Sequence, residues 1–196
     1  MYTSLTAQHS DEPKTDYLIR DYFQTIILHS AFCIMHFPEE QMRAVLTRVK
    51  SASVSIGGEV VGKIGKGFLI LLGVGPNDTE KECRYLAEKA LGLRVFTDEN
   101  DKMNLVLDAV NGEVLVVSQF TLYGNCRRGR RPSFSEAAGP ELGNALYEKL
   151  LSVCAELGYP PQHGEFGADM QVESINDGPV TLILDTDELM NEPRRK

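Results

Sequence analysis

A continuous apolar run at residues 67–74 constrains the fold of this chain more than any other feature. Its sequence, GFLILLGV, carries no polar side chain on either of the two faces that a strand presents. A strand with one solvated face alternates apolar and polar residues, so this run predicts a strand that is covered on both sides. With 196 residues, of which 42% are hydrophobic, the chain is large enough to supply that cover.

Two helical patterns supply one covering layer. After Asp78, apolar residues recur on one stripe, and after Pro140 they recur at three- and four-residue steps until Gly158. Gly57-Gly58 predicts a tight hairpin, and the segment 176–179, NDGP, is typical of a turn between two strands. Further strands are expected at residues 44–50, 52–56, 59–61, 105–107, 113–122, 171–175 and 180–185. The pattern predicts an α+β domain whose helices cover one face of a largely antiparallel sheet.

The first 41 residues differ from the rest of the chain. They lack the basic start and long apolar core of a signal peptide, and no run within them is long enough to cross a bilayer. Met42-Arg43-Ala44-Val45 looks like a fresh beginning. We therefore expect residues 1–41 to be an extension, either disordered or the product of a wrong start site, followed by one domain at 42–187 and a flexible tail at 188–196.

Cysteine usage and charge limit the classes of function. The four cysteines form no C-x-x-C pair, and three histidines of the extension follow no ligand spacing, so neither a metal site nor a cofactor is predicted. Reduced thiols favour a cytoplasmic location, and no membrane segment is expected. The formal net charge of -8 means that a nucleic-acid partner needs a local basic patch.

The segment Ser118-Gln119-Phe120-Thr121 follows a run of buried residues, VLVV at 114–117. As the end of a strand it has two interpretations: a polar terminus facing solvent, or a site whose free backbone N–H groups hold an oxyanion. A threonine nucleophile requires a neighbouring base. Outside the extension the sequence offers only His163 for that role, in a loop-like context, so a Ser/Thr–His–Asp triad is poorly supported.

A cluster of arginines comes directly after this segment. Four arginines lie within five residues and are followed by a phenylalanine: Arg127, Arg128, Arg130, Arg131 and Phe134. Such a run is either a solvated surface loop or a phosphate clamp, because the guanidinium group suits forked phosphate contacts. Its position beside the polar strand end favours a clamp for the terminus of an RNA.

Several motifs in order resemble the D-aminoacyl-tRNA deacylase family of bacteria and eukaryotes. They are MRAV at 42–45, SQFTL at 118–122, GRRPSF at 129–134, FGADM at 166–170 and NDGPVT at 176–181. The resemblance covers residues 42–185 and implies the family's fold, with a barrel-like, largely antiparallel or mixed sheet and two main amphipathic helices. It also implies hydrolysis of the ester that joins a D-amino acid to the 3′ terminal adenosine of tRNA, without a metal or cofactor.

The resemblance further implies a homodimer and assigns roles to individual residues. Ser118, Gln119, Phe120 and Thr121 would form the adenosine pocket and reaction site. Gly178 and Pro179 would form a cis dipeptide that enters the partner's site and rejects L-amino acids, with Arg48 holding it in orientation. Glycine has no side chain to exclude, so glycyl-tRNA mischarged on tRNA-Ala is an expected second substrate. Two alternatives are an RNA-binding module without activity and a related deacylase with a trans Gly-Pro.

Overall fold

The computed structural model describes residues 42–127 and 129–191. The predicted extension at 1–41 lies outside the described residues, and so does most of the predicted tail. None of the described helices is long and apolar enough to cross a membrane. The elements in chain order are β1 (Arg43–Ile56), β2 (Glu59–Ile64), β3 (Gly67–Gly73), α2 (Glu80–Leu91), β4 (Phe96–Thr97), β5 (Met103–Leu105), η1 (Asp108–Val110), β6 (Glu113–Ser118), η2 (Phe120–Tyr123), α3 (Pro140–Glu156), β7 (Gln162–His163), β8 (Met170–Asp185) and α4 (Thr186–Asn191).

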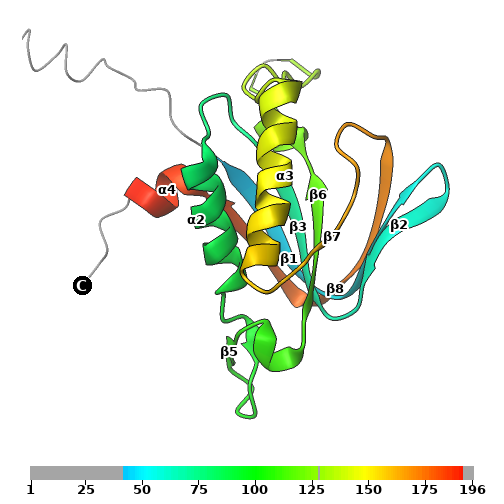
Figure 1. The fold of residues 1–196 in the computed structure, drawn as a ribbon, viewed down its shortest axis with the longest axis vertical. Coiled ribbons are helices and arrows are strands. Elements are labelled where there is room, and N and C mark those ends of the chain that lie inside the picture. The colour runs from blue at the N-terminus through cyan, green and yellow to red at the C-terminus, as the bar shows by residue number, and fades with distance from the viewer. Residues whose placement is uncertain (1–41, 128, 192–196) are drawn as a thin grey trace, which may run out of the picture. The chain divides into compact units, whose positions relative to one another are not determined.

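The long strand β1 organises the sheet. One edge of β1 pairs with β3 over its first half and with β2 over its second half, while the other edge pairs with β8 along its whole length. The sheet continues from β3 through β6 to β7, and these last two pairings are parallel. The fold is therefore α+β with a mixed, nearly closed, barrel-like sheet, as predicted (Figure 1).

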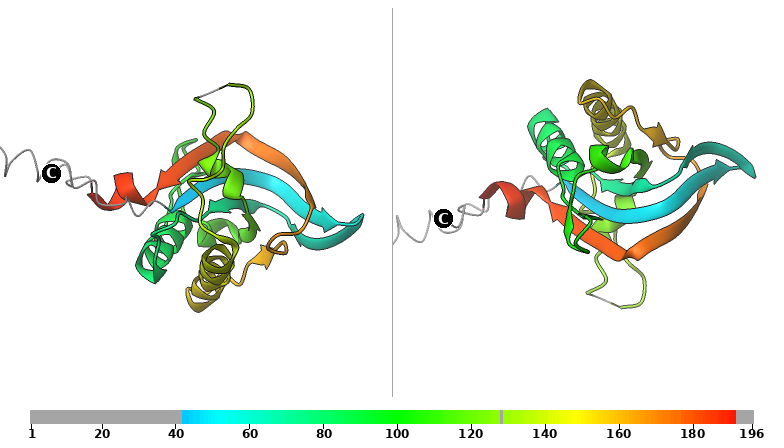
Figure 2. Two further views of the ribbon diagram at one scale, coloured as in Figure 1. Left: turned by 90° about the horizontal axis from the view of Figure 1, so that it is seen from above. Right: turned by 90° about the horizontal axis from the view of Figure 1, so that it is seen from below.

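The apolar run at 67–74 is buried on both faces, as its sequence predicts. One face, with Phe68 and Ile70, packs against the helices α2 and α3, which lie together on one side of the sheet (Figure 2). The other face, with Leu69, packs inside the barrel against Val54 of β1 and Val117 of β6. This run thus separates the helical layer from the interior of the barrel.

Both predicted helices form, with ends that the sequence explains. Thr79 caps α2, and the Glu82 carboxylate accepts a hydrogen bond from the Thr79 N–H at 3.0 Å, which completes a capping box. Gly139 precedes Pro140 at the first position of α3, where a missing N–H is harmless. The last helix, α4, runs across residue 187, the domain boundary expected from the sequence.

The expected turn between two final strands does not form. Residues 170–185 make one strand, β8, whose two halves both pair with β1 in the antiparallel direction. The register jumps from Thr47↔Thr181 to Val49↔Asn176, so residues 177–180 face a single residue, Arg48. The NDGP segment is therefore a large bulge in one strand and not a hairpin, because its flanks share the same partner strand.

Candidate active site

The SQFTL segment, residues 118–122, lies where β6 ends. The strand stops at Ser118, and residues 120–123 form the short helix η2, so the expected continuation of the strand to Leu122 is wrong. The Gln119 N–H donates to the Leu72 carbonyl at 2.6 Å, and the Leu122 N–H then donates to the Gln119 carbonyl at 3.2 Å. The chain therefore turns immediately after its last backbone hydrogen bond to β3.

The turn changes which groups the segment presents. A strand would alternate its side chains, whereas the first N–H groups of a helical turn have no acceptor within that turn. Of the described hydrogen bonds, none uses the N–H of Phe120 or of Thr121 as its donor. The Gln119 amide donates to the Thr121 hydroxyl oxygen. The N–H groups of Phe120 and Thr121 and the hydrogen-bonded side chains of Gln119 and Thr121 thus lie together at the end of β6.

Tyr123, the last residue of η2, anchors this turn in the protein interior. Its ring is buried, and the Arg43 guanidinium carbon lies 4.8 Å from the ring centroid. Burial, followed by the nearby Asp78 carboxylate, raises the pKa of the Tyr123 hydroxyl far above its usual value. Tyr123 is therefore neutral at physiological pH and stabilises the packing of η2 without serving as a base.

The bulge at residues 177–180, named here the Gly-Pro loop, is held from both ends. The Gly178–Pro179 peptide is cis, as the resemblance implies. Asn176 clamps the loop, because its side-chain oxygen accepts from the Val180 N–H at 3.0 Å while its amide donates to the Thr181 hydroxyl at 3.0 Å. No role for Asn176 was predicted, although an asparagine at the start of the NDGP turn is a usable signal for a side-chain hydrogen bond to the backbone.

Arg48 supports the loop from inside the fold. Its side chain is 7% exposed, and its Nε donates to the Asp177 carbonyl at 2.9 Å. Its Nη1 donates to the Val95 carbonyl, and the guanidinium lies over the Phe96 ring at 6.0 Å. The buried arginine therefore ties the Gly-Pro loop to the segment after α2, contacts that sequence reasoning did not find.

Glycine is required at position 178. The residue has φ +130°, in the region that side chains disfavour. A Cβ atom there would lie 2.7 Å from the Arg48 Nη2 and 3.0 Å from the Val180 Cγ2. Arg48 is fixed by its own hydrogen bonds, so its guanidinium cannot move away to make room for a Cβ atom at residue 178.

Within one chain the two regions lie far apart along β1. The SQFTL segment packs beside Gly73, which pairs with Arg43, whereas the Gly-Pro loop faces Arg48. Five residues of extended strand span roughly 17 Å. Residues 118–121 and residues 178–179 therefore form two separate regions in a single chain.

The arginine loop, residues 126–132, leaves the SQFTL segment through a narrow neck. Asn125 and Ser133 exchange backbone hydrogen bonds of 2.7 and 3.0 Å at its base. Of the predicted phosphate contacts, Arg127, Arg130 and Arg131 are exposed, whereas Arg128 lies outside the described residues. The described arginines are thus available to solvent next to the SQFTL segment.

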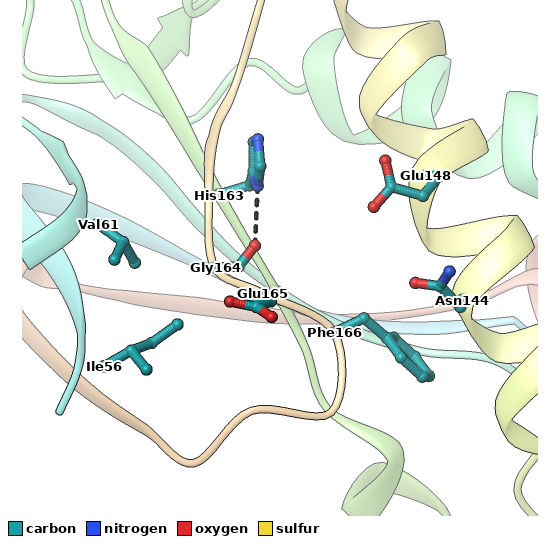
Figure 3. A pocket seen from close by; sticks show the side chains of 8 residues that line it. All are labelled: Ile56, Val61, Asn144, Glu148, His163, Gly164, Glu165 and Phe166. Atoms are coloured by element: carbon teal, nitrogen blue, oxygen red, sulfur yellow. Dashed lines mark hydrogen bonds between the residues drawn. The ribbon is translucent and has the colours of Figure 1, made fainter.

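A pocket of about 440 Å³ lies between β7, the β1–β2 hairpin and α3, and none of the SQFTL residues lines it (Figure 3). It contains His163, whose Nδ1–H donates to the Gly164 carbonyl at 2.8 Å. No described hydrogen bond joins His163 to Thr121, so the geometry gives no support to a triad. In the described part of the chain, no three His, Cys, Asp or Glu side chains are placed to hold a metal ion.

Comparison with known proteins identifies the family. Residues 45–185 match the family model described as D-Tyr-tRNA(Tyr) deacylase. The D-aminoacyl-tRNA deacylase of Thermosipho africanus is 57% identical over 145 residues, 74% of this chain and 97% of that protein. The deacylase of Desulfatibacillum aliphaticivorans is 60% identical over 145 residues, 74% of this chain and 99% of that protein.

Solved structures agree on the fold. One described as a c-Myc DNA Unwinding Element Binding Protein is 41% identical, with a TM-score of 0.68 over 72% of this chain and 97% of that one. A probable eukaryotic D-amino acid tRNA deacylase is 17% identical, has a TM-score of 0.65 over 74% of this chain and 99% of that one, and shows the shared fold alone. On the family model and the two bacterial relatives, the chain belongs to the D-aminoacyl-tRNA deacylase family, whose members are hydrolases that act on aminoacyl-tRNA.

Proposed function

We propose that this chain hydrolyses the ester of D-aminoacyl-tRNA, and of glycyl-tRNA mischarged on tRNA-Ala, and that it rejects L-aminoacyl-tRNA. Membership of the deacylase family supports the reaction. One observation carries the mechanism: a bulge in an edge strand contains Gly178, is hydrogen-bonded by Arg48 and Asn176, and lies about 17 Å along β1 from the main-chain donors of η2. The two regions have complementary chemistry, and only a second chain brings them together.

The SQFTL segment supplies the reaction site in this scheme. The terminal adenosine binds along Ser118 to Thr121, and the N–H groups of Phe120 and Thr121 donate to the carbonyl oxygen as it becomes an oxyanion. A water molecule attacks the carbonyl carbon, oriented by the 2′-hydroxyl of the adenosine. The bond to the 3′-oxygen then breaks, and that oxygen takes up a proton. An aminoacyl ester is activated enough that no side-chain base is needed.

The Gly-Pro loop supplies the stereochemical selection. An enzyme that accepts many D-amino acids has to bind what they share, the ammonium group and the arrangement around Cα. The carbonyl oxygens of Gly178 and Pro179 contact the ammonium and occupy the space that an L side chain requires. A ten-thousand-fold preference corresponds to about 5.5 kcal/mol, which a steric clash supplies and one methylene contact does not. Glycine passes because it has nothing to exclude.

A homodimer completes the site. In the described sheet β8 pairs only with β1, so its outer edge is unpaired. Three apolar side chains of β8 are exposed, at 38% for Val172, 58% for Ile175 and 78% for Ile183. A two-fold interface along this edge buries them and delivers each Gly-Pro loop to the partner's SQFTL segment. The same contact gives two identical sites per dimer.

The arginine loop binds the tRNA. The chain has a net charge of -8, so its attraction to RNA has to come from a local patch. Arg127, Arg130 and Arg131 provide it in the described residues, and Arg128 adds a fourth charge in the same loop. In this proposal the enzyme acts in the cytoplasm, where its tRNA substrate is, and its reaction uses neither a metal nor a cofactor.

The direct test compares hydrolysis of matched D-, L- and glycyl-tRNA. We expect rapid release of D-amino acids and glycine, and a rate at least about a thousand-fold lower for the L-form, which corresponds to roughly 4 kcal/mol of discrimination. Equal rates for D- and L-substrates would rule out the proposed selection. Protection of the ester without hydrolysis would instead identify an RNA-binding module.

A complementation experiment tests the exchange between subunits. Ser118→Trp fills the adenosine pocket, and Gly178→Ala distorts the loop, so each variant alone is expected to be inactive. If the loop acts on the partner, a mixed dimer contains one site with both defects and one site with none, and mixing restores about a quarter of the wild-type activity for random exchange. Without any restoration after verified subunit exchange, the loop acts in its own chain and the proposal fails.

A further inference from the structure

Two phenylalanine rings beside the SQFTL segment are exposed although they contact each other. The side chains of Phe120 and Phe134 are 57% and 38% exposed. Their ring centroids lie 5.3 Å apart with an angle of 72° between the planes, an edge-to-face pair. Large apolar side chains that gather at a surface commonly mark a site of contact with another molecule.

The ring of Phe134 is held in place by the backbone around it. The Asn125–Ser133 bridge fixes the preceding residue, and the Phe134 carbonyl accepts from the Ala137 N–H at 3.2 Å. The ring packs on Gly124, where a Cβ atom would lie 3.1 Å from the Phe134 Cε1. Because these contacts already limit the positions of the ring, a ligand that stacks on it costs less side-chain entropy than one that stacks on a freely rotating ring.

The charge around the pair indicates what binds there. The arginine loop begins and ends within two residues of the bridge that positions Phe134, and Arg127, Arg130 and Arg131 are exposed in it. Sites for single-stranded nucleic acid combine positive charge along the backbone with aromatic rings on which bases stack. A protein partner would fit the two rings as well, but it would not require three arginines beside them.

We infer that Phe120 and Phe134 form a stacking platform for the unpaired base that precedes the terminal adenosine of the substrate RNA. This inference rests on the proposed function, which places the adenosine along residues 118–121. Phe134 lies beyond that segment in the direction of the arginine loop, so the platform extends the site from one nucleotide to two. The contact is independent of sequence, because every base offers a flat aromatic face.

Binding of short single-stranded RNA tests the platform without requiring catalysis. The probes are an RNA ending in CCA and the same RNA with an abasic nucleotide before the terminal adenosine. We expect Phe134→Leu to weaken binding of the intact probe about ten-fold, within the range for loss of one base–aromatic stack. It should leave the abasic probe unchanged, so that the two changes are not additive. Phe134→Tyr keeps the ring and should bind the intact probe like the wild type.

Leu157→Ala is the matched control. Leu157 is exposed to 37%, nearly as much as Phe134, and it follows the C-terminal end of α3, whereas Phe134 precedes the N-terminal end of that helix. It should bind both probes like the wild type. Equal weakening of both probes by Phe134→Leu, or no weakening of either, overturns the platform. A change in oligomeric state with unchanged RNA binding also overturns it, by assigning the rings to a protein contact. Hydrolysis of D-aminoacyl-tRNA by the wild type reports separately on the proposed function.

Discussion

The Gly-Pro loop and the SQFTL segment are built in opposite ways. The loop bulges out of the pairing between β8 and β1, yet the buried Arg48 and the exposed Asn176 both bind it, and its glycine has no room for a Cβ atom. The SQFTL segment begins inside the fold, at the end of a buried strand, yet it exposes Phe120 and two main-chain N–H groups. One region is tied to the fold by side-chain hydrogen bonds, while the other ends a buried strand with two N–H groups that donate in none of the described hydrogen bonds.

This difference matches the two tasks of the proposed reaction. Selection by steric exclusion requires a boundary that does not yield, because a shift of 1 Å would admit the wrong enantiomer or obstruct the right one. Stabilising an oxyanion requires only donors at the correct place. We therefore expect substitutions at the loop to have large effects, and substitutions in the SQFTL segment that only shorten a side chain, leaving the backbone and the pocket as they are, to have small ones.

The largest effect is expected for Gly178→Ala. The new methyl group meets the Arg48 Nη2 at 2.7 Å, and its backbone has to keep φ +130°, so the loop shifts. A misplacement of this size lowers the rate of hydrolysis of D-aminoacyl-tRNA by about 100-fold. Gly58→Ala is the control, because Gly58 has φ +88° but open space around its Cβ position. If both variants lose activity equally, backbone strain and not loop position explains the effect.

Arg48→Ala should have the next largest effect. It leaves the carbonyls of Asp177 and Val95 without the buried donor that they have now, which destabilises the fold by about 2–4 kcal/mol. Urea unfolding measures that loss, and the ratio of D- to L-hydrolysis should fall with it. Arg94→Ala is the control, since Arg94 also donates to a backbone carbonyl, that of Asn104, but is exposed. An unchanged ratio in a folded Arg48→Ala protein would contradict the orienting role.

Thr121→Ala distinguishes a threonine nucleophile from stabilisation of the oxyanion by main-chain N–H groups in the SQFTL segment. Its hydroxyl oxygen accepts from the Gln119 amide, and no described base bonds to it, so it is not activated as a nucleophile. We expect kcat to fall by no more than about ten-fold, since the main-chain donors remain. A loss of a thousand-fold or more with normal RNA binding would assign the threonine a covalent role and remove the contrast with the loop.

The sequence predicted the layers of this fold better than its local turns. The run at 67–74 correctly indicated a strand covered on both faces, and the two helices followed from their periodicity. The prediction of a turn at the NDGP segment is wrong because the same residue types occur in hairpin turns and in bulges within one strand. Only the pairing of both flanks with β1, a long-range feature, decides between them.

The candidate site was predictable in part for the same reason. Motif residues such as Gly178 and Thr121 could be named from the resemblance, but the carbonyl of Val95 and the clamp by Asn176 depend on distance in space. The stop of β6 at Ser118 was missed because the apolar content continues through Phe120 and Leu122. The pairing ends after the hydrogen bond from the Gln119 N–H to Leu72, because the Leu122 N–H then donates to the Gln119 carbonyl and the chain turns.

The smallest effect is expected on removal of metal ions. In the proposed reaction both regions contact the substrate through main-chain atoms, and the described residues hold no group of ligands suited to a metal. Pretreatment with 1,10-phenanthroline should leave the rate of hydrolysis unchanged, with Mg²⁺ kept in the assay so that the tRNA stays folded. His9, His29 and His36 provide a sharp alternative, because they lie outside the described residues. If phenanthroline abolishes activity and Zn²⁺ restores it, the full chain is compared with a version that starts at Met42. Loss of the Zn²⁺ dependence in the shorter version places the ligands in residues 1–41, and its persistence places them in the domain.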